Sequence, residues 1–283
     1  MAARYDRRAR SYGRCWAPVL APSALALLDA IEPVIGALPA ADLLDAGTGS
    51  GTLALAAIRR WPHVRVTGLD ISAGMLALVR AAAAAALESA DQARLSLVEG
   101  DVAEPGSALP ARASMDAAVS SFVLHLVPDR AAALAGLRRV LRPGGVLAFV
   151  VWADEATSWA AEAAFDGALS TTLERAGVAA PASGGGRRAG PIGSAAAARA
   201  ELHAAGFADV DAWEPRLRHP FGRAETRELF VAYDRAADLA ALSPDVRAAV
   251  LAAFDEKLAR LPDAAFAWEA PLVAARSVRP PDD

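Results

Sequence analysis

The sequence is poor in the residues that build disulfides and metal centres. It has one cysteine, Cys15, and four histidines scattered along 283 residues. A single cysteine excludes a disulfide framework and a cysteine-rich zinc site. The scattered histidines argue against a metal centre built by the protein, so we expect no metal.

Positive charge is not in excess either. Lys257 is the single lysine, and 29 basic residues stand against 33 acidic residues, which gives a formal net charge of −4. A broad nucleic-acid-binding face needs clustered positive charge to contact phosphates. The charge balance therefore argues against a nucleic-acid partner.

Long apolar runs are missing as well. No stretch reaches the about 18 uninterrupted apolar residues of a membrane span. The charged start of the chain, residues 1–16, has no apolar segment behind it of the kind that a secretory signal carries. We predict a cytoplasmic protein without a membrane span.

Hydrophobic residues nevertheless make up 54% of the chain, which excludes a disordered protein and allows a real core. Short apolar runs alternate with helical stretches up to residue 152, and such runs suit strands that are buried on both faces. Helices between strands imply right-handed crossovers and a parallel sheet. The expected strands are 41–46, 64–70, 94–101, 115–121 and 145–152. The expected helices are 18–37, which we expect to be interrupted near Pro33, 51–60, 72–89 and 130–141.

The pattern loosens after residue 152. Residues 181–193 are rich in glycine and predict a mobile loop. Ser194 and Ser243 are suited to cap the helices that follow them. The expected helices here are 155–176, 194–205, 224–240 and 244–260, and the expected strands are 207–213 and 264–278.

The most informative segment is LLDAGTGSGTLAL, residues 43–55, where a strand ends at Asp45 and a helix starts near Gly51. Gly47, Gly49 and Gly51 allow the backbone to approach a ligand where any Cβ would clash. Free N–H groups at the start of the helix favour a polar or anionic group. A plain glycine turn between strand and helix is the alternative.

A second acid, Asp70, ends the next strand in VRVTGLD. In this position a nucleotide-type ligand places its ribose, and a carboxylate can accept from both ribose hydroxyls. A nicotinamide oxidoreductase would want glycine or alanine three residues beyond the second glycine. Thr52 occupies that place, so the pattern is G-x-G-x-G and this reading fails.

These motifs resemble those of the class I S-adenosylmethionine-dependent methyltransferases. DAGTGSG and Asp70 in GLDIS match the first two family motifs, and Asp101 in VEGDVAE matches the third. SSFVLHLVPDR at 120–130 and RRVLRPGGVLAFVVW at 138–152 match the fourth and fifth strand regions. The start of the chain is similar to small-molecule members related to ubiquinone and menaquinone biosynthesis, in which it helps to cover the cofactor.

The resemblance implies a Rossmann-like, doubly wound α/β fold. Its sheet would have seven strands, mostly parallel with the last antiparallel, together with a helical N-terminal lid and an inserted substrate cap. We divide the chain into a lid and helix at 1–40, a cofactor-binding core at 41–152, and at 153–283 the cap with the C-terminal strands. The cofactor would be S-adenosyl-L-methionine and the product S-adenosyl-L-homocysteine. The cofactor-binding residues would be Tyr12, Asp45, Gly47, Thr48, Gly49, Gly51, Asp70, Ile71, Met75, Asp101, Val102 and Ser120.

In this interpretation Asp45 lies near the ammonium of the methionine part, and Ile71 packs on the adenine. Asp101 accepts from the adenine amino group, and the Val102 N–H donates to a ring nitrogen. Two alternatives stay open, because Asp101 can simply cap a turn and Asp45 can simply bind the glycine loop.

His125 is the candidate catalytic base, because it follows the fourth strand and imidazole titrates near neutral pH. It can also pack beside the cofactor without moving a proton, since proximity alone can drive methyl transfer. Aromatic residues after the core suit a hydrophobic or aromatic acceptor, although ordinary core packing is the alternative for each. The candidate substrate-binding residues are Trp16, Trp152, Trp159, His219 and Phe221.

The sequence therefore predicts methyl transfer to the oxygen, nitrogen or carbon of a small molecule. The alternative is a protein of the same fold that binds the cofactor without methylating, in a cyclisation or a regulatory role. The expected partner is the small-molecule acceptor, and a homodimer is compatible with the sequence.

Overall fold

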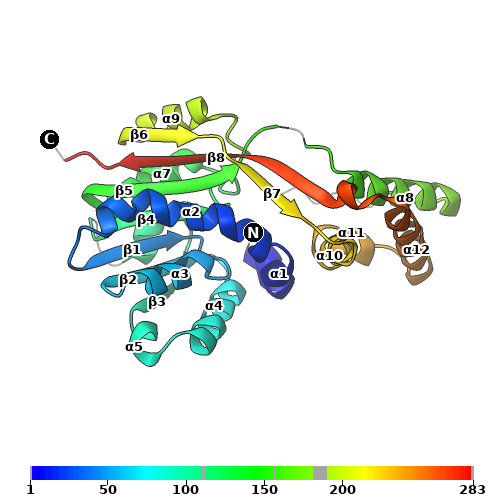
Figure 1. Ribbon diagram of the computed structural model, residues 1–283, viewed down its shortest axis with the longest axis horizontal. Coiled ribbons are helices and arrows are strands. Elements are labelled where there is room, and N and C mark those ends of the chain that lie inside the picture. The colour runs from blue at the N-terminus through cyan, green and yellow to red at the C-terminus, as the bar shows by residue number, and fades with distance from the viewer. Residues whose placement is uncertain (1, 110–112, 156, 181–189, 282–283) are drawn as a thin grey trace.

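A computed structural model describes residues 2–109, 113–155, 157–180 and 190–281, with the side chains of residues 2–8 not described. Its centre is an eight-stranded sheet in the order β3-β2-β1-β4-β5-β8-β6, with β7 pairing β8 off this path (Figure 1). Strands β1 to β5 pair in parallel, and β8 is antiparallel to β5 and to β6. The strands are β1 (Ala41–Ala46), β2 (Val64–Asp70), β3 (Leu95–Glu99), β4 (Met115–Ser121), β5 (Leu141–Trp152), β6 (Ala208–Trp213), β7 (Arg216–Pro220) and β8 (Ala267–Val278).

The predicted α/β fold with an antiparallel last strand is confirmed, with one strand more than expected. The additional strand is β7, which pairs with the first half of β8. Its sequence, RLRHP, carries one buried residue, Leu217. Because its other residues are polar or end the strand, no apolar run predicts it.

Helices cover both faces of the sheet. In β5, Val146, Ala148 and Val150 belong to the core on the side of α2 and α3, whereas Leu147 and Phe149 belong to the core on the side of α7 and α9. This alternation is the doubly wound arrangement. The helices are α1 (Ala2–Cys15), α2 (Ala17–Ile35), α3 (Thr52–Arg60), α4 (Ala73–Ala86), α5 (Ser89–Gln92), α6 (Pro105–Ala108), α7 (Arg130–Val140), α8 (Ala160–Ala176), α9 (Ala195–Ala204), α10 (Arg223–Leu229), α11 (Ala236–Ala240) and α12 (Pro244–Arg260).

Helix ends follow local chemistry. The Ser194 hydroxyl accepts from the Ala197 N–H at 3.1 Å, and Ser243 accepts from Val246 at 3.4 Å, so both predicted N-caps are confirmed. Two boundaries differ from expectation. Helix α2 continues through Pro33 to Ile35, and the expected helix 224–240 is broken by a π-helical turn, Phe230–Asp234. The predicted mobile loop, 181–193, lies mostly outside the described residues.

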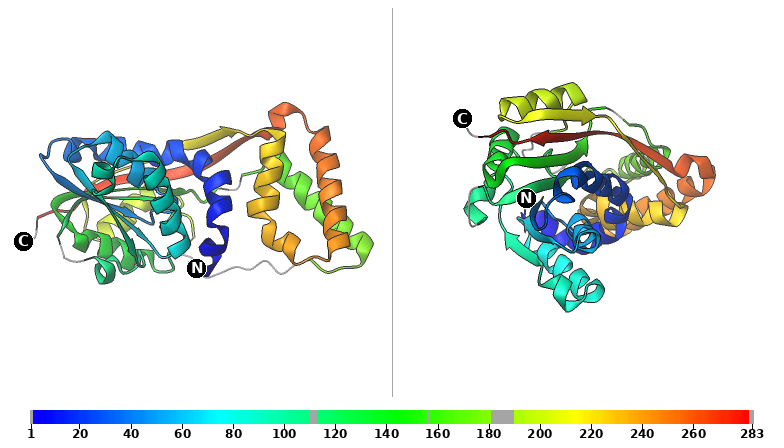
Figure 2. Two further views of the ribbon diagram at one scale, coloured as in Figure 1. Left: turned by 90° about the horizontal axis from the view of Figure 1, so that it is seen from below. Right: turned by 60° about the vertical axis from the view of Figure 1, so that its left-hand side comes forward.

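A second body of helices extends from one end of the sheet. Helices α8, α10, α11 and α12 lie beyond the core, and β7 and β8 run out toward them while α1 lies between (Figures 1 and 2). We call these four helices with the π-turn the cap. Three buried phenylalanines form its centre, with the Phe165 and Phe254 ring centroids 5.1 Å apart and the Phe165 and Phe230 centroids 5.5 Å apart.

Helix α2 is long and apolar enough to cross a membrane by length and composition. In the structure it packs against β4, β5 and α3, and Leu27, Leu28 and Ile31 are buried there. The core therefore covers the face of the helix that carries these residues, and 39% of the apolar window is buried.

Candidate active site

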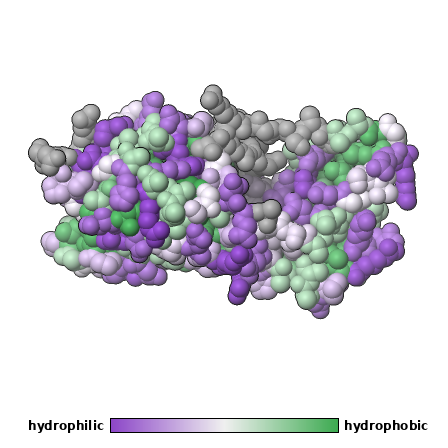
Figure 3. Space-filling model, turned by 90° about the horizontal axis from the view of Figure 1, so that it is seen from above, coloured by the Kyte–Doolittle hydropathy of each residue, from purple (hydrophilic) through white to green (hydrophobic). Residues whose placement is uncertain are grey.

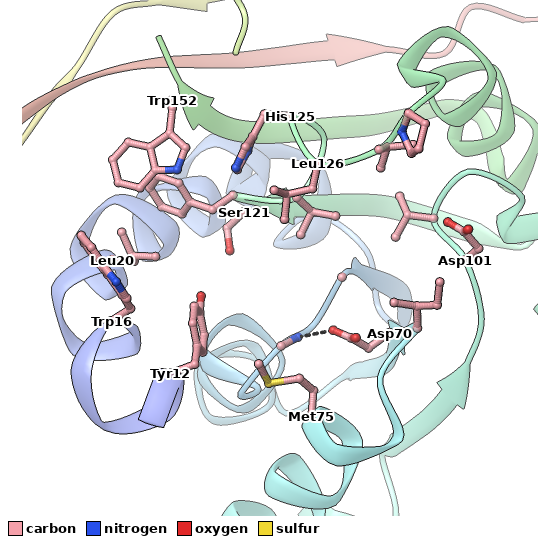
Figure 4. A pocket seen from close by; sticks show the side chains of 18 of the residues that line it. Tyr12, Trp16, Leu20, Asp70, Met75, Asp101, Ser121, His125, Leu126 and Trp152 are labelled. Carbon is pink, nitrogen blue, oxygen red and sulfur yellow. Dashed lines mark hydrogen bonds between the residues drawn. The ribbon is translucent and has the colours of Figure 1, made fainter. Parts of the chain in front are cut away.

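A cavity of about 570 Å³ opens where β1, β2, β4 and β5 end. Ligands of open α/β sheets bind at this carboxyl edge, and the volume is in the ordinary range of small-molecule sites, about 300–1,000 Å³. Figure 4 shows the acids at one end and most of the aromatic side chains at the other. The lining residues are Tyr12, Trp16, Leu20, Gly47, Gly49, Asp70, Ile71, Met75, Asp101, Val102, Ser121, Phe122, Val123, His125, Leu126, Val127, Pro128, Trp152 and Tyr233.

The three glycines of the loop after β1 all have positive φ, but they serve different purposes. A Cβ on Gly47 would lie 2.3 Å from Val123, and one on Gly51 would lie 2.8 Å from Val79, so packing requires both. A Cβ on Gly49 would meet nothing nearer than 3.9 Å. Gly49 lines the cavity, so its missing side chain leaves room for a ligand.

Asp70 ends β2 and faces the glycine loop. Its carboxylate accepts from the Gly49 N–H at 2.8 Å and from the Ser72 N–H at 2.9 Å. Asp101, after β3, is exposed and accepts from the Ala103 N–H at 2.8 Å, which is a turn-capping bond. Both acids still line the cavity, and they are its only charged lining side chains among the described residues.

Asp45 lies behind the loop rather than along the main cavity. Its Oδ2 accepts from the Thr48 hydroxyl at 2.7 Å and from the Ala54 N–H at 3.1 Å, so it ties the loop to the start of α3. Burial raises the pKa of Asp45 to about 7, against the two hydrogen bonds, and the nearby Asp70 carboxylate adds to the rise. Such a carboxyl favours a nearby cation, because a positive charge lets it ionise.

The other end of the cavity is aromatic. Trp16 and Trp152 meet edge to face with ring centroids 6.2 Å apart, and Phe122 lies 4.7 Å from Trp152. Tyr12 points its hydroxyl into the cavity from α1, with Ser121 and His125 on the far side (Figure 4). His125 sits in the segment between β4 and α7, where its carbonyl accepts from the Gly190 N–H at 3.1 Å.

Several predicted residues lie away from this cavity. Ser120 is fully buried and donates to the Ala46 carbonyl at 2.9 Å, because strand alternation turns Ser121 toward the cavity instead. Trp159 and Phe221 are buried against each other, with ring centroids 5.1 Å apart. His219 lies on β7 beside Phe221 and hydrogen bonds Glu225 at 3.1 Å. Asp45, Thr48 and Gly51 support the loop from behind.

The comparisons with known proteins agree with this arrangement. A family model described as a methyltransferase domain matches residues 43–145. Nocamycin O-methyltransferase of Saccharothrix syringae is 34% identical over 257 residues, which cover 88% of this chain and 87% of that protein. The chain belongs to the class I S-adenosylmethionine-dependent methyltransferases. This methyltransferase uses S-adenosylmethionine to methylate its acceptor, and the identity over most of both chains does not favour a non-methylating role.

Two further comparisons cover a smaller share of the other protein. Trans-aconitate 2-methyltransferase of Azoarcus sp. (strain BH72) is 40% identical over 109 residues, 38% of each chain. The structure of phosphoethanolamine N-methyltransferase 2 of Haemonchus contortus with S-adenosyl-L-methionine matches with a TM-score of 0.53 at 17% identity. That match covers 92% of this chain and 53% of the other, and it shows the fold alone.

Among the residues of the methyltransferase site that sequence reasoning missed, three line the cavity and one lies behind its wall. Ser121 and Phe122 follow the predicted Ser120, and the alternation of β4 could have separated Ser121 from Ser120. Phe122 has a φ of +56°, which no sequence pattern announces. Tyr233 lies in the π-turn, and Trp268 on β8 backs the aromatic end. Both depend on packing between distant segments.

Proposed function

We propose that the acidic end of the cavity binds the adenosyl part of S-adenosylmethionine and that the aromatic end binds a hydroxyl-bearing, apolar acceptor. The observation that carries the proposal is the polarity of the cavity. Asp70 and Asp101 stand at one end, and aromatic rings with the polar groups of Tyr12, Ser121 and His125 stand at the other.

The residues at the acidic end fit the cofactor. In this proposal Asp70 accepts from the ribose hydroxyls, and Asp101 and Val102 bind the adenine edge while Ile71 packs on its face. Open space at Gly49 admits the methionine part, with the Gly47 and Gly49 backbone beside it. Asp45 and Thr48 hold the loop from behind, and the buried Asp45 carboxyl would ionise when the positive charge of the cofactor lies nearby.

The cofactor supplies a methyl group on a positively charged sulfur, which leaves as a neutral thioether when a nucleophile takes the methyl. The chain positions the acceptor and keeps water away from the reacting groups. Trp16, Trp152 and Phe122 hold the acceptor in line with the methyl group and exclude water from it. His125 accepts the hydroxyl proton, because a neutral hydroxyl is a poor nucleophile.

The charges of the lining restrict the acceptor. A carboxylate buried at the aromatic end would have only the positive sulfur of the cofactor to offset its charge, and an ammonium would have no anion beside it. Among the described residues no arginine or lysine lines the cavity, and both lining carboxylates lie at the other end. A hydroxyl, in contrast, is satisfied by Tyr12, Ser121 and His125.

The remaining predictions from the sequence extend this proposal. We propose as a functional division a lid and helix at residues 1–40, a cofactor-binding core at 41–152, and the capping helices with the C-terminal strands of the sheet at 153–283. A free small molecule, rather than nucleic acid, suits the net charge of −4. A homodimer and a cytoplasmic location stay predictions.

Three acceptors with one ring system test the proposal: 1-naphthol, the anion 1-naphthoate and the cation of 1-naphthylmethylamine. With labelled S-adenosylmethionine we expect transfer to the naphthol alone. In His125→Asn the transfer rate should fall by about 10²–10⁴-fold, the usual contribution of a general base, and lose its rise with pH near neutrality. His203→Asn, on α9, is the matched control and should keep the wild-type rate. Preferred transfer to the carboxylate or the amine would refute the acceptor class, and a full rate in His125→Asn would refute the base.

A further inference from the structure

Trp268 lies outside the cavity and contacts two of the tryptophans that line it. Its ring centroid is 5.3 Å from that of Trp16, with 67° between the planes, and 5.9 Å from that of Trp152, at 73°. Both are edge-to-face contacts, a favourable geometry for aromatic pairs. The three indoles form a triangle, because Trp16 and Trp152 also contact each other.

The strand register explains how Trp268 reaches this position. Trp152 of β5 pairs with Leu272 of β8, and residues at even spacing along a strand share one face. Trp268 and Leu272 therefore point the same way, with the small Ala270 between them leaving room for the large rings. On the other side, β7 pairs His219 with Trp268 and fixes this part of β8.

Behind Trp268 lies a second aromatic layer. The ring centroids of Trp159 and Phe221 are 6.4 Å and 6.1 Å from that of Trp268, and both side chains are buried. The Trp159 indole N–H donates to the Ala265 carbonyl at 3.1 Å, which anchors this layer. Trp268 thus stands between a fixed layer and the wall of the cavity.

Among the described residues, each of the two lining indoles has one further side-chain hydrogen bond or ring contact. Trp16 is held by its Nε1–H, which donates to Asp234 Oδ1 at 3.0 Å at the exposed end of the π-turn. Trp152 packs against Phe122, with ring centroids 4.7 Å apart. Removing the ring of Trp268 would open space behind both indoles at once, and each could tilt into it.

We propose that Trp268 is a positioning residue that sets how large a ring system the acceptor end admits, by holding Trp16 and Trp152 in place. The acceptor class it selects is a flat, uncharged aromatic hydroxyl compound whose ring fits against the two indoles. This inference rests on the proposed function, because it assigns the aromatic end to the acceptor.

Indole N–H signals test the positioning without any acceptor. In ¹H–¹⁵N spectra, Trp268→Ala should shift the signals of Trp16 and Trp152 and leave that of Trp61, which bonds Glu32 on the other side of the molecule, in place. Trp213→Ala is the matched control, since Trp213 pairs with Ala274 of the same strand but lines a separate groove. Unmoved Trp16 and Trp152 signals in Trp268→Ala would overturn the proposal.

Binding of phenol and 1-naphthol to the protein saturated with S-adenosylhomocysteine tests the selection. In Trp268→Ala the affinity ratio of naphthol to phenol should rise about tenfold, the scale on which apolar pockets discriminate size. Trp268→Phe should restore most of the wild-type ratio, and affinity for S-adenosylhomocysteine should stay unchanged in all variants. Shifted indole signals with an unchanged ratio would overturn the selection. If the wild type binds neither compound but binds S-adenosylhomocysteine, the selection and the hydroxyl-acceptor class both fail, while the indole spectra still decide the positioning.

Discussion

Gly49 and Gly144 share a backbone conformation and differ in what surrounds them. Their φ angles are +55° and +80°, so an alanine at either place costs about 1–2 kcal/mol of folding free energy. A Cβ on Gly144 meets nothing within 4 Å, whereas Gly49 lines the cavity. We predict that Gly49→Ala lowers affinity for S-adenosylhomocysteine more than tenfold in calorimetry, because the methyl group takes up ligand space.

Gly144→Ala is the control for this prediction. It introduces the same backbone strain far from the ligand and should bind S-adenosylhomocysteine as the wild type does. Equal affinity in the two variants would mean that the ligand does not pass Gly49.

Asp45 makes the stability of the ligand-free protein depend on pH. Burial raises its pKa from 3.8 to about 7 in the folded state. Between these two values the unfolded chain has lost the proton and the folded protein retains it, so the free energy of unfolding falls as pH rises. We predict that Asp45→Asn, which cannot ionise, gains stability relative to the wild type between pH 4 and pH 7.

Urea unfolding of both proteins at pH 4 and pH 8 measures this difference. Asp263→Asn removes the same charge at a fully exposed position and serves as the control. If the difference between Asp45→Asn and the wild type is the same at both pH values, Asp45 is already ionised in the folded protein.

Helix α1 joins the core to the cap at the edge of the cavity. The Trp16 indole donates to Asp234 at 3.0 Å, Arg14 pairs with Glu228, and the Tyr12 and Tyr233 rings lie 5.9 Å apart. All of these contacts link α1 and the residue after it to α10 and the π-turn. They place α1 where it can cover a bound cofactor.

We predict that S-adenosylhomocysteine slows amide hydrogen exchange in α1 and the π-turn, because a segment over the ligand must open to admit it. Asp234→Ala should speed exchange in α1 in the ligand-free protein. Helix α9, on the opposite face of the sheet, should exchange alike in all samples. Exchange in α1 that is indifferent to the ligand would show that this helix is not a lid.

At the scale of helices and strands, the sequence predicts the structure correctly where its pattern of apolar residues reports burial. Short apolar runs predict β1 to β5 because a parallel sheet buries both faces of its strands. The sequence does not predict strand β7, because its outward residues are Arg216 and Arg218. It does not predict the π-turn either, because a change in hydrogen-bond spacing does not alter the composition.

The same limit applies to the site. Glycines and acids in fixed order predict the cofactor end, but aromatic residues do not reveal whether they face a cavity or a core. Trp152 lines the cavity, whereas Trp159, also predicted to bind substrate, lies in the layer behind Trp268. Only the register of β8 with β5 and β7 shows that Trp152 faces the cavity and Trp159 does not.

In the molecule as a whole, the aromatic end of the cavity lies between the core and the cap. The core lies on one side and the cap on the other, and the visible face in Figure 3 mixes hydrophilic and hydrophobic residues over both. The cap is tied internally by Arg235, whose guanidinium pairs with Asp166 at 2.9 Å and lies over the Phe165 ring. Core residues build the acidic end of the cavity, Tyr12 of α1 lies beside the glycine loop, and core, α1 and π-turn together build the aromatic end.

A crystal structure with bound S-adenosylhomocysteine tests the account most directly, because it fixes both ends of the cavity at once. We predict the ribose hydroxyls on the Asp70 carboxylate, the adenine beside Ile71 and Val102, and the sulfur directed toward Tyr12 and His125. An adenine ring stacked among Trp16, Trp152 and Phe122, with Asp70 touching only the protein, would contradict it.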